Sequence, residues 1–231
     1  MFFVVRHGER ADFSYDSKEK SRVFKDYDPP LTAVGLKQSL KTGDFIKNSL
    51  NKINSVNKTP IIITSPFLRC VETAINIAKN FDFIYENSIF LENSIGEYLH
   101  RTWFTYNVYD DLMIKKQQIN DGYKFIDGFL DKKEMEALSL QYPEDFVVFF
   151  KRIQNAMEQI SKKFFMEFDE KKYFLVIVTH GYAVQVVLKN YSALQKIQDI
   201  EYCSITLLKY RADGNYDTLI SASDAHLFAK L

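Results

Sequence analysis

The sequence predicts an α/β fold: a mostly parallel sheet with helices on both faces, in three layers (α/β/α). Short continuous apolar runs alternate with stretches of helical period, which is the pattern of strand–helix–strand crossover units. The strands lack an alternating polar face, as expected of a parallel sheet that is covered on both sides. The 231 residues suit one α/β domain, so we expect residues 1–231 to form a single domain with an insertion over the carboxyl ends of the strands.

The first half of the chain predicts two buried strands and two helices. The apolar runs MFFVV (1–5) and TPIIIT (59–64) have the length and composition of strands buried on both faces. Residues 13–30 are polar and end in two prolines, which predicts an extended loop. Thr32 suits the N-cap of a helix whose expected apolar face is Leu36, Leu40 and Phe45 or Ile46. The segment SPFLRCVETAINIAKNF predicts a second helix with one buried face: Cys70, Ala74, Ile77, Ala78 and Phe81.

The second half continues the alternation after a long insertion. SIFL (88–91) predicts a third strand, and roughly residues 98–142 have no clear period, so we interpret them as a partly helical insertion. From Pro143 a helix is predicted with a core stripe: Phe146, Phe150, Ile153, Met157, Ile160 and Phe164. YFLVIVTHG (173–181) is the fourth strand, ending in a second His-Gly, and YAVQVVLKNY is a helix. SITLLKY and YDTLISAS then form a hairpin around Asp213-Gly214.

Bulk composition excludes several classes of partner. The formal net charge is zero, which gives no electrostatic footprint for nucleic acid or an anionic membrane. No apolar window approaches a membrane span, and MFFVV is too short for a signal sequence. Cys70 and Cys203 are too few for a disulfide framework. We therefore expect a cytoplasmic protein that binds neither nucleic acid nor membrane.

Residues with distinctive chemistry follow each of the first four predicted strands. Arg6, His7 and Arg10 follow the first strand, Ser65 and Arg69 the second, Glu97 the third and His180 the fourth. Ligands of open α/β sheets bind beyond the carboxyl ends of the strands, so these side chains should converge on one rim. Each feature alone has a plain structural explanation, such as a His-Gly turn or a solvated arginine. Their coincidence on successive strand ends predicts an anion site.

The residue types indicate phosphoryl chemistry. Guanidinium groups match phosphate oxygens, and the helix after the second strand adds amide groups at its N-terminus. A neutral imidazole can attack phosphorus, and nearby arginines disfavour its protonated form. Arginines can stabilise the transferring phosphoryl group without metal, so we expect no cofactor. A carboxylic acid is needed to protonate a poor leaving group; Glu97 is the best-placed candidate, with Asp12, Asp110 and Asp111 as alternatives.

The motifs RHG, LTAVG, TSPFLRCVETA and THG together resemble the histidine phosphatase (phosphoglycerate mutase-like) superfamily. RHGERAD, DPPLT and SIGEYL are most similar to the branch that contains the suppressor-of-T-cell-receptor-signalling proteins and the insect ecdysteroid-phosphate phosphatases. The resemblance implies that His7 is the phosphorylated nucleophile and Glu97 the proton donor. It also implies that Arg6, Arg10, Arg69 and His180 hold the phosphoryl group, with His180 counted among the catalytic residues.

The resemblance has departures that bear on function. The chain begins almost at the catalytic strand, so the ubiquitin-associated and SH3 domains of multidomain relatives are expected to be absent. Mutases of this superfamily usually carry serine or threonine after RHGE, whereas Arg10, Ala11 and Asp12 stand here, which favours hydrolysis. The expected function is a metal-independent phosphomonoesterase that acts on a small molecule or a phosphotyrosyl protein. A phosphoglycerate mutase-type phosphotransferase and a non-catalytic phosphate-binding or dimerisation module stay open, as does a homodimer.

Four aromatic residues of the insertion have two equally weighted interpretations, and three other residues are interpreted as structural. The aromatic residues Trp103, Phe104, Tyr106 and Tyr109 could line a substrate pocket or pack the insertion onto the sheet. His100 and His226 are interpreted as surface or structural residues. Cys70 is interpreted as a small buried hydrophobe.

Overall fold

A seven-stranded sheet runs through the middle of the computed structural model, which describes residues 1–52, 57–109, 111–112, 122–131, 141–191, 199–211, 213 and 215–229. The strand order is β4-β3-β2-β5-β1-β6-β7. The strands are β1 (Phe2–Arg6), β2 (Thr59–Thr64), β3 (Ser88–Leu91), β4 (Lys124–Asp127), β5 (Tyr173–Thr179), β6 (Ile205–Tyr210) and β7 (Tyr216–Ser223). The five strands from β4 to β1 are parallel, and β6 and β7 are antiparallel, so the sheet is mostly parallel as predicted.

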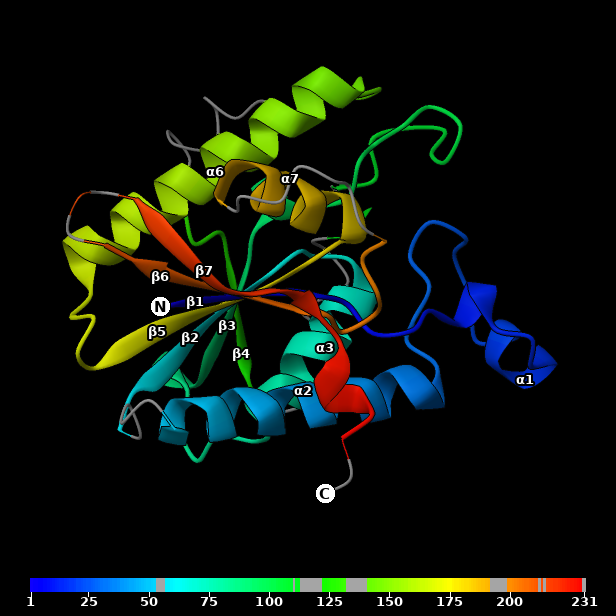
Figure 1. Cartoon of the computed structure of the whole chain (residues 1–231). Coiled ribbons are helices and arrows are strands. Elements are labelled where there is room, and N and C mark those ends of the chain that lie inside the picture. The colour runs from blue at the N-terminus through cyan, green and yellow to red at the C-terminus, as the bar shows by residue number, and fades with distance from the viewer. Residues whose placement is uncertain are drawn as a thin grey trace.

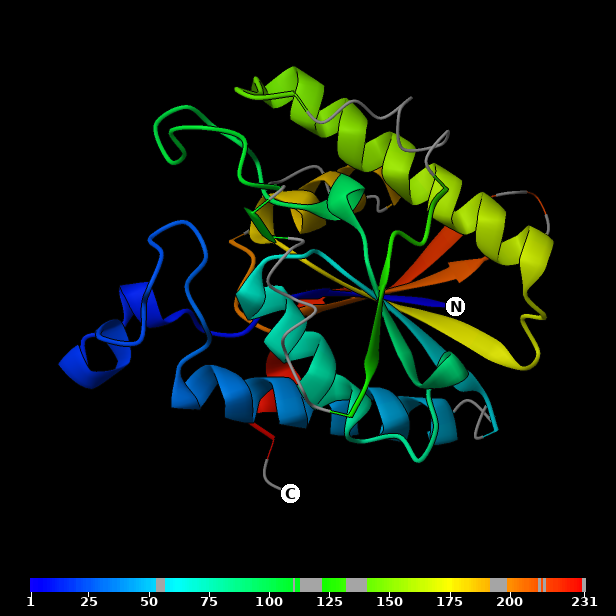
Figure 2. The same ribbon diagram turned by 180° about the vertical axis from the view of Figure 1, so that it is seen from behind.

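Helices cover both faces of this sheet and complete three layers (Figures 1 and 2). On one face α6 (Phe146–Glu167) and α7 (Gly181–Tyr191) pack on the side chains of Phe2, Val4 and their neighbours. On the other face α2 (Ala33–Lys52) and α3 (Leu68–Ala78) pack on Phe3, Val5 and their neighbours. Successive strand residues point to opposite faces, so the unbroken apolar run of β1 supplies both halves of the core.

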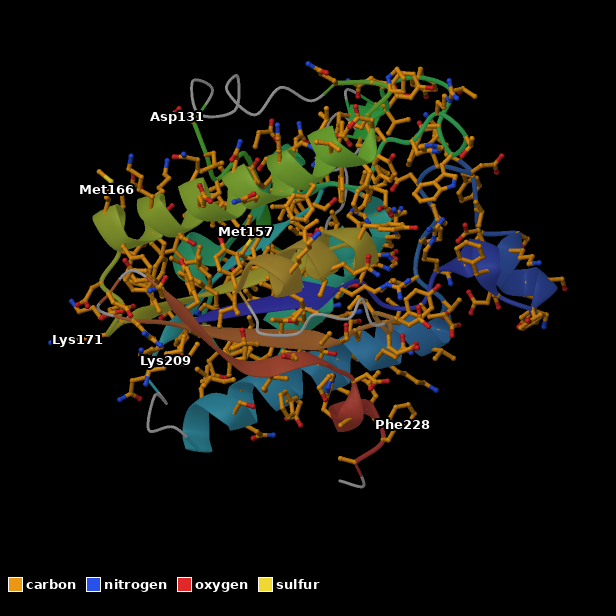
Figure 3. The ribbon with its side chains drawn as sticks, turned by 45° about the horizontal axis from the view of Figure 1, so that its top comes forward. Asp131, Met157, Met166, Lys171, Lys209 and Phe228 are labelled. Atoms are coloured by element: carbon orange, nitrogen blue, oxygen red, sulfur yellow. The ribbon has the colours of Figure 1, made fainter. Side chains whose placement is uncertain are left out.

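The helices turn one side to the sheet and the other to solvent. On α6, Met157 is buried, whereas Met166 is 75% exposed and projects away from the ribbon (Figure 3). Asp145 caps this helix, because its Oδ1 accepts a hydrogen bond of 2.8 Å from the Val148 amide. The remaining elements are short: the helix α1 (Ser17–Lys20) and 3-10 turns at Ala11–Phe13, Tyr85–Asn87, Asn93–Ile95 and Ala225–Leu227.

Several predicted elements need correction. Residues 13–30 include α1 and part of a 3-10 turn rather than only extended loop, and α6 begins three residues after Pro143. The insertion also contributes a strand: β4 pairs in parallel with β3 at the edge of the sheet. Its four residues are only partly buried, so the segment lacks the apolar run that marks the other parallel strands. Phe146, predicted in the core stripe, is 45% exposed.

Helix α2 buries a different face from the predicted one. Leu40 is 42% exposed, while the buried positions include Ser39, Thr42, Gly43 and Ile46. A Cβ on Gly43 would lie 2.9 Å from the Ile77 Cα of α3, so the small residues let the two helices approach closely. Close helix–helix packing therefore outweighed the apolar spacing here. Thr32 is the N-terminal cap as predicted, since its Oγ1 accepts from the Gly35 amide at 2.9 Å.

The remaining predictions of strands and helices are confirmed in the described ranges, except that α3 ends at Ala78, before the predicted Phe81. The predicted helical part of the insertion is not tested, because residues 113–121 and 132–140 lie outside the described residues. β2 and β3 have the predicted bounds, β6 and β7 form the predicted hairpin, and Gly214 of its turn lies outside the described residues. None of the helices in the described ranges is both long and apolar enough to cross a membrane.

Candidate active site

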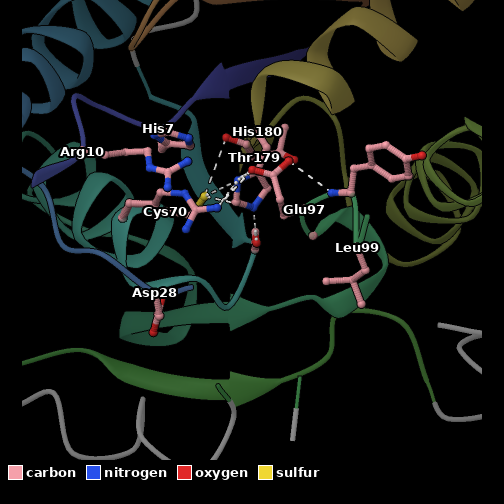
Figure 4. Close-up of polar contacts among 12 residues, drawn as sticks. His7, Arg10, Asp28, Cys70, Glu97, Leu99, Thr179 and His180 are labelled. Atoms are coloured by element: carbon pink, nitrogen blue, oxygen red, sulfur yellow. Dashed lines mark hydrogen bonds and ion pairs between the residues drawn. The ribbon is translucent and has the colours of Figure 1, made fainter. Parts of the chain in front are cut away.

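The carboxyl ends of β1, β2, β3 and β5 meet at one edge of the sheet, where a cavity of about 620 Å³ opens. Five of the six predicted site residues line this cavity: Arg6, His7, Arg10, Arg69 and Glu97. The sixth, His180, is fully buried and contacts two of the lining side chains, Arg69 and Glu97. The structure thus brings all six together from segments as distant in sequence as β1 and β5 (Figure 4).

The ring of His7 is held in one tautomer by the backbone. Its Nδ1 lies 2.8 Å from the Gly8 carbonyl oxygen, which can only accept a hydrogen bond. The proton therefore sits on Nδ1, and Nε2 keeps its lone pair. Burial, followed by the positive charge of Arg69, holds the pKa of His7 well below its usual value of 6.5. His7 is consequently neutral at physiological pH and can act as a nucleophile.

The segment that carries His7 is packed tightly against α2 and α3. The Gly8 amide donates to Thr73 Oγ1 at 3.0 Å, and the same hydroxyl donates to the Arg69 carbonyl at 2.7 Å. A Cβ on Gly8 would lie only 2.7 Å from the Gly35 carbonyl oxygen, so a side chain there would displace α2 or the loop. These contacts fix the position of His7 relative to Arg69.

Arg69 is the buried cation of the site. It is 1% exposed, and its Nη2 lies 3.1 Å from Glu97 Oε2 and 3.2 Å from His180 Nδ1. Its Nε and Nη1 have no hydrogen-bond partner in the described part of the chain, although both are buried. Buried guanidinium donors are normally paired, so two free donors beside a cavity indicate a missing anionic ligand.

The two other arginines are already partly engaged. Arg6 donates from Nη1 to the Ile200 carbonyl, stacks 4.1 Å above the Tyr202 ring, and has a buried Nε without a partner in the described residues. Arg10 is held by both oxygens of Asp12, at 3.0 and 2.6 Å. The two guanidiniums are thereby fixed in direction before any ligand arrives.

His180 and Glu97 form a buried pair with Arg69. His180 Nδ1 lies 3.2 Å from Glu97 Oε2, and its Nε2 lies 2.7 Å from Ser65 Oγ. Burial lowers the pKa of His180 to about 4, so its ring is neutral at pH 7. Burial opposes ionisation of Glu97, but the imidazole and the Arg69 guanidinium outweigh it and hold its pKa well below 4.5. Without ligand, Glu97 is therefore a carboxylate.

The loop that presents Glu97 is held by a second buried arginine, which the sequence interpretation missed. Arg152 of α6 donates to three carbonyl oxygens of this loop: Ser94 at 2.8 Å, Gly96 at 3.4 Å and Glu97 at 3.0 Å. Its charge is balanced by Glu144, with contacts of 2.6 and 2.8 Å. An arginine inside an amphipathic helix gave no sign of this role, because the partners are backbone atoms some 55 residues away.

One expectation about the surroundings changes, and one is confirmed. The N-terminus of α3 does not offer its first amide to a ligand, because Asp28 Oδ1 accepts from the Leu68 amide at 2.6 Å. Cys70 is buried as predicted, but its Sγ lies 3.5 Å from His180 Nε2, and burial raises the pKa of its thiol to about 12. The thiol is therefore a neutral packing group.

The aromatic residues of the insertion divide between the two interpretations. Trp103 and Phe104 line the cavity, and Tyr106 lines a neighbouring hollow. Tyr109 is buried and packs on Phe67 and against Gly96, where a Cβ would collide with its hydroxyl. The sequence analysis did not anticipate a further set of lining residues. Most of them lie in segments without a periodic pattern, and two lie on the exposed side of the first turns of α7: Phe13, Asp26, Tyr27, Asp199, Ile200 and Glu201, and on α7 Tyr182 and Gln185.

The residues set aside have local partners. His226 Nε2 lies 3.0 Å from Thr42 Oγ1, and His100 Nδ1 lies 2.7 Å from Thr102 Oγ1. Of the alternative acids, Asp12 pairs with Arg10, Asp111 bonds to Tyr106 at 2.6 Å, and Asp110 lies outside the described residues. Within the described ranges no three His, Cys, Asp or Glu side chains come together in an arrangement that could hold a metal ion.

Fold and site together define an α/β protein with a buried, cationic pocket at the carboxyl ends of its parallel strands. The profile of the histidine phosphatase superfamily (branch 1) matches residues 2–221, and the chain belongs to this superfamily. The superfamily includes phosphatases and mutases.

Two curated proteins are similar to parts of the chain. Human ubiquitin-associated and SH3 domain-containing protein A is 32% identical over 121 residues, which are 41% of this chain and 17% of that protein. The phosphohistidine phosphatase SixA homolog of Haemophilus influenzae is 28% identical over 116 residues, which are 50% of this chain and 62% of that protein. The matched stretch thus spans less than two thirds of either relative.

Solved structures share the fold at low sequence identity. The ecdysone phosphate phosphatase of Bombyx mori, in complex with tungstate, aligns with a TM-score of 0.61 and 17% identity, covering 96% of this chain and 92% of that one. Phosphoglycerate mutase of Bacillus anthracis aligns with a TM-score of 0.60 and 17% identity, covering 98% and 94%. The fold is therefore the phosphoglycerate mutase-like fold.

Proposed function

We propose that the protein is a metal-independent phosphatase that hydrolyses phosphomonoesters through a phosphohistidine on His7. The observation that carries the proposal is the pairing of a neutral His7, with its lone pair on Nε2, and a buried Arg69 with two unpaired donors. A nucleophile and an anion-binding group on the same cavity are the two parts that phosphoryl transfer requires.

The proposed reaction has two steps. In the first, His7 Nε2 forms a bond to phosphorus while the bond from phosphorus to the ester oxygen breaks, and Glu97 gives that oxygen its proton. The negative charge of the bound dianion raises the pKa of Glu97, which allows it to carry this proton. In the second step, water attacks phosphorus, the phosphorus–nitrogen bond breaks, and Glu97 takes the proton of the water.

The arginines and His180 hold the transferring group during both steps. In this proposal, Arg69 binds phosphoryl oxygens through Nε and Nη1, and Arg6 and Arg10 complete the cationic ring. In this proposal, His180, which contacts Arg69 and Glu97, takes up a proton beside the bound dianion and then donates to the phosphoryl group. The names of the relatives support the class, since one is a phosphohistidine phosphatase homolog and another a phosphatase of ecdysone phosphate.

The mutase alternative is supported by the shared fold alone. A phosphoglycerate mutase must also bind a carboxylate, but the three cations that line the cavity all lie at the proposed phosphoryl end. Of the non-catalytic alternatives, a dimerisation module gives the buried unpaired donors no role. A phosphate-binding module would use them, but it would form no phosphoenzyme. The physiological substrate is proposed to be a phosphorylated small molecule or a phosphotyrosyl protein, and the cytoplasmic location and a homodimer stay predictions.

The direct test is to trap the phosphoenzyme. Brief incubation with a labelled phosphomonoester should label the protein; the label should survive an alkaline quench and be lost in acid, as a phosphoramidate is. His7→Ala should abolish the label, whereas His100→Ala, which removes an exposed histidine, should retain it. Acid-stable label, or label that persists in His7→Ala, would exclude the proposed intermediate.

A further inference from the structure

We propose that the outer half of the active-site cavity selects the charge of the leaving group: it accepts phosphomonoesters whose leaving group carries a positive charge and excludes those that carry a carboxylate. This inference rests on the proposed phosphatase function and deepens it. It assigns a role to three lining residues, Asp26, Asp199 and Glu201, that take no part in the chemistry above.

Charge is segregated along the cavity. Every cation among its lining residues belongs to the phosphoryl end, namely Arg6, Arg10 and Arg69, while every further charged lining residue besides Glu97 is acidic. In the described part of the chain, no lysine and no fourth arginine lines it. A ligand in the cavity therefore meets arginines at the buried end, whereas the exposed charged residues that line the described part of the cavity are all acidic.

The orientation of a substrate follows from the buried end. Arg69 is almost completely buried and keeps two unpaired donors, so the phosphoryl group must bind there. His7 is also buried, and attack by its Nε2 requires the leaving oxygen on the opposite side of phosphorus. The carbon skeleton of the substrate consequently extends outward, toward the acidic residues.

The acidic residues differ in how free they are. Asp26 and Asp199 are exposed and form no ion pair with a cation in the described ranges. Glu201 already interacts with Arg6: burial lowers the pKa of this guanidinium, and Glu201 is one of the groups that oppose the decrease. Two carboxylates are thus available to a ligand cation. Charges near a partly enclosed protein surface interact more strongly than in bulk water, so a leaving-group carboxylate is repelled at this end.

Three exposed aromatic rings also border the cavity. Phe13, Trp103 and Tyr182 line the cavity and are 66%, 50% and 40% exposed. The rings of Trp103 and Tyr182 lie 5.7 Å apart at their centroids, tilted by 32°. Ring faces attract cations and also pack on a carbon skeleton, so they favour a leaving group that is aromatic or aliphatic and carries an ammonium or guanidinium group.

Three aryl phosphates of one skeleton test the inference: phosphotyramine with an ammonium group, 4-ethylphenyl phosphate without charge, and phosphorylated 4-hydroxyphenylpropionate with a carboxylate. Their phenols are similar leaving groups, so the chemical step is matched. We expect kcat/KM to fall in that order, at least about tenfold from first to last, which corresponds to about 1.4 kcal/mol. The spread should shrink with added salt, because the acidic residues are exposed.

Substitutions test whether Asp26 and Asp199 cause the preference for a positively charged leaving group. In the double variant Asp26→Asn, Asp199→Asn the ratio of kcat/KM for the ammonium and carboxylate compounds should fall several-fold, with the neutral compound as internal reference. Glu158→Gln removes one exposed carboxylate from α6, outside this cavity, and should leave the ratio unchanged. An equal fall in both variants would mean that net charge, and not the cavity, sets the preference.

A second comparison, with peptides, distinguishes a small amine substrate from a phosphotyrosyl protein that carries a lysine. Two phosphotyrosyl peptides that differ only in a lysine or a glutamate beside the phosphotyrosine present the same chemistry on a macromolecule. If the lysine peptide and phosphotyramine are both preferred, the cavity selects a positive charge in small molecules and in peptides alike. A preference confined to phosphotyramine identifies a small amine.

The outcomes distinguish this inference from the function beneath it. If none of the compounds releases phosphate and none labels the protein, the proposed phosphatase function fails. If all three are hydrolysed with equal kcat/KM, the function stands and the charge selection is wrong. A preference for the carboxylate compound would also overturn it.

Discussion

The Gly8 carbonyl, burial and Arg69 together keep His7 in its neutral form with a free lone pair on Nε2. The Gly8 carbonyl fixes the tautomer, while burial and Arg69 keep the ring unprotonated. The same cation also pairs with Glu97, so nucleophile and proton donor are both tuned by one guanidinium. Changes at Arg69 should therefore affect binding and chemistry together.

Arg69→Lys should lower kcat/KM by more than about tenfold, or roughly 1.4 kcal/mol of transition-state stabilisation. Lysine keeps the charge but cannot direct two donors at phosphoryl oxygens while it holds Glu97. The measurement is steady-state kinetics with one aryl phosphate. Arg22→Lys, an exposed arginine paired with Glu19, is the matched control and should behave like the parent protein. A value for Arg69→Lys near that of the control would return Arg69 to a structural role.

The pH dependence should differ with the leaving group. Since Glu97 is ionised without ligand, the proton for the leaving oxygen has to be taken up with the substrate. For an alkyl phosphate, kcat/KM should therefore fall about tenfold per pH unit above roughly pH 6, where the second phosphate pKa lies. Nitrophenyl phosphate needs no such proton and should give a nearly flat profile. Because the pKa of His7 is lowered, its protonation should cause no loss between pH 7 and 6.5.

Glu97→Gln should remove this difference. The penalty on single-turnover alcohol or phenol release should be large for the alkyl ester and small for nitrophenyl phosphate, and the slope with pH should vanish. Single turnover is needed because Glu97 also serves the water in the second step. Equal penalties for both esters would show that Glu97 is not the acid.

Residue identities at the site could be predicted from the sequence, but their partners could not. His7 and His180 stand directly after apolar strands, and Arg69 lies in the first turn of the helix that follows β2. Parallel strands must bring such positions together. The clamp of Asp12 on Arg10 and the stacking of Tyr202 on Arg6 depend on loop conformations without any periodic pattern. Local spacing therefore predicts which groups meet, and not how each is oriented.

At the scale of elements, α6 positions the loop after β3 through Arg152. One guanidinium binds three carbonyl oxygens of residues 94–97, and Glu144 neutralises it. Breaking a buried ion pair such as Arg152–Glu144 costs several kcal/mol in general. Through Arg152, the position of α6 therefore determines the position of Glu97, the proposed proton donor.

Arg152→Lys should impair proton donation more than folding. Lysine keeps a positive charge beside Glu144 but lacks the guanidinium group that binds the three carbonyl oxygens. The rate of the phosphorylation step with an alkyl ester should therefore fall roughly three- to tenfold, which corresponds to the free energy of about one hydrogen bond. Nitrophenyl phosphate should lose much less. Arg211→Lys, an exposed arginine paired with Asp213 and Asp217, is the control.

The double variant decides between a positioning and a general role for Arg152. When Glu97 is already glutamine, Arg152→Lys should add little to the alkyl-ester penalty, because the group that it positions is gone. Additive penalties, or equal losses for both esters, would mean that the substitution only loosens the fold.

Elements were predictable where the hydrophobic pattern was strong. β1, β2, β3 and β5 are largely apolar runs, and their bounds are confirmed within two residues. β4 was missed because an edge strand needs no apolar run, and the buried face of α2 because Gly43 and Ser39 are small rather than apolar. Both failures arise where packing geometry replaces hydrophobic patterning.

At the scale of the whole molecule, the proposed reaction needs no ion. Activity should be unchanged after treatment with a chelator, and vanadate, a mimic of five-coordinate phosphorus, should inhibit strongly. The measurement is phosphate release before and after exhaustive chelation, with readdition of Mg²⁺, Mn²⁺ and Zn²⁺ as the control. Activity lost to the chelator and restored by one of these ions would refute a metal-independent mechanism. The assignment of residues 1–231 to one domain stays a prediction.

The central place of β1 has a consequence for biosynthesis. Both strands that pair with β1 lie late in the chain: Phe2 pairs with Leu175 of β5 and with Leu208 of β6. A ribosome adds about 5–20 residues per second, so on the order of ten seconds or more separates β1 from its first partner. During that interval an apolar strand and its histidine have no sheet to join. A chain that stops before residue 173 therefore cannot assemble the site, and leaves β1 free to aggregate or to bind a chaperone.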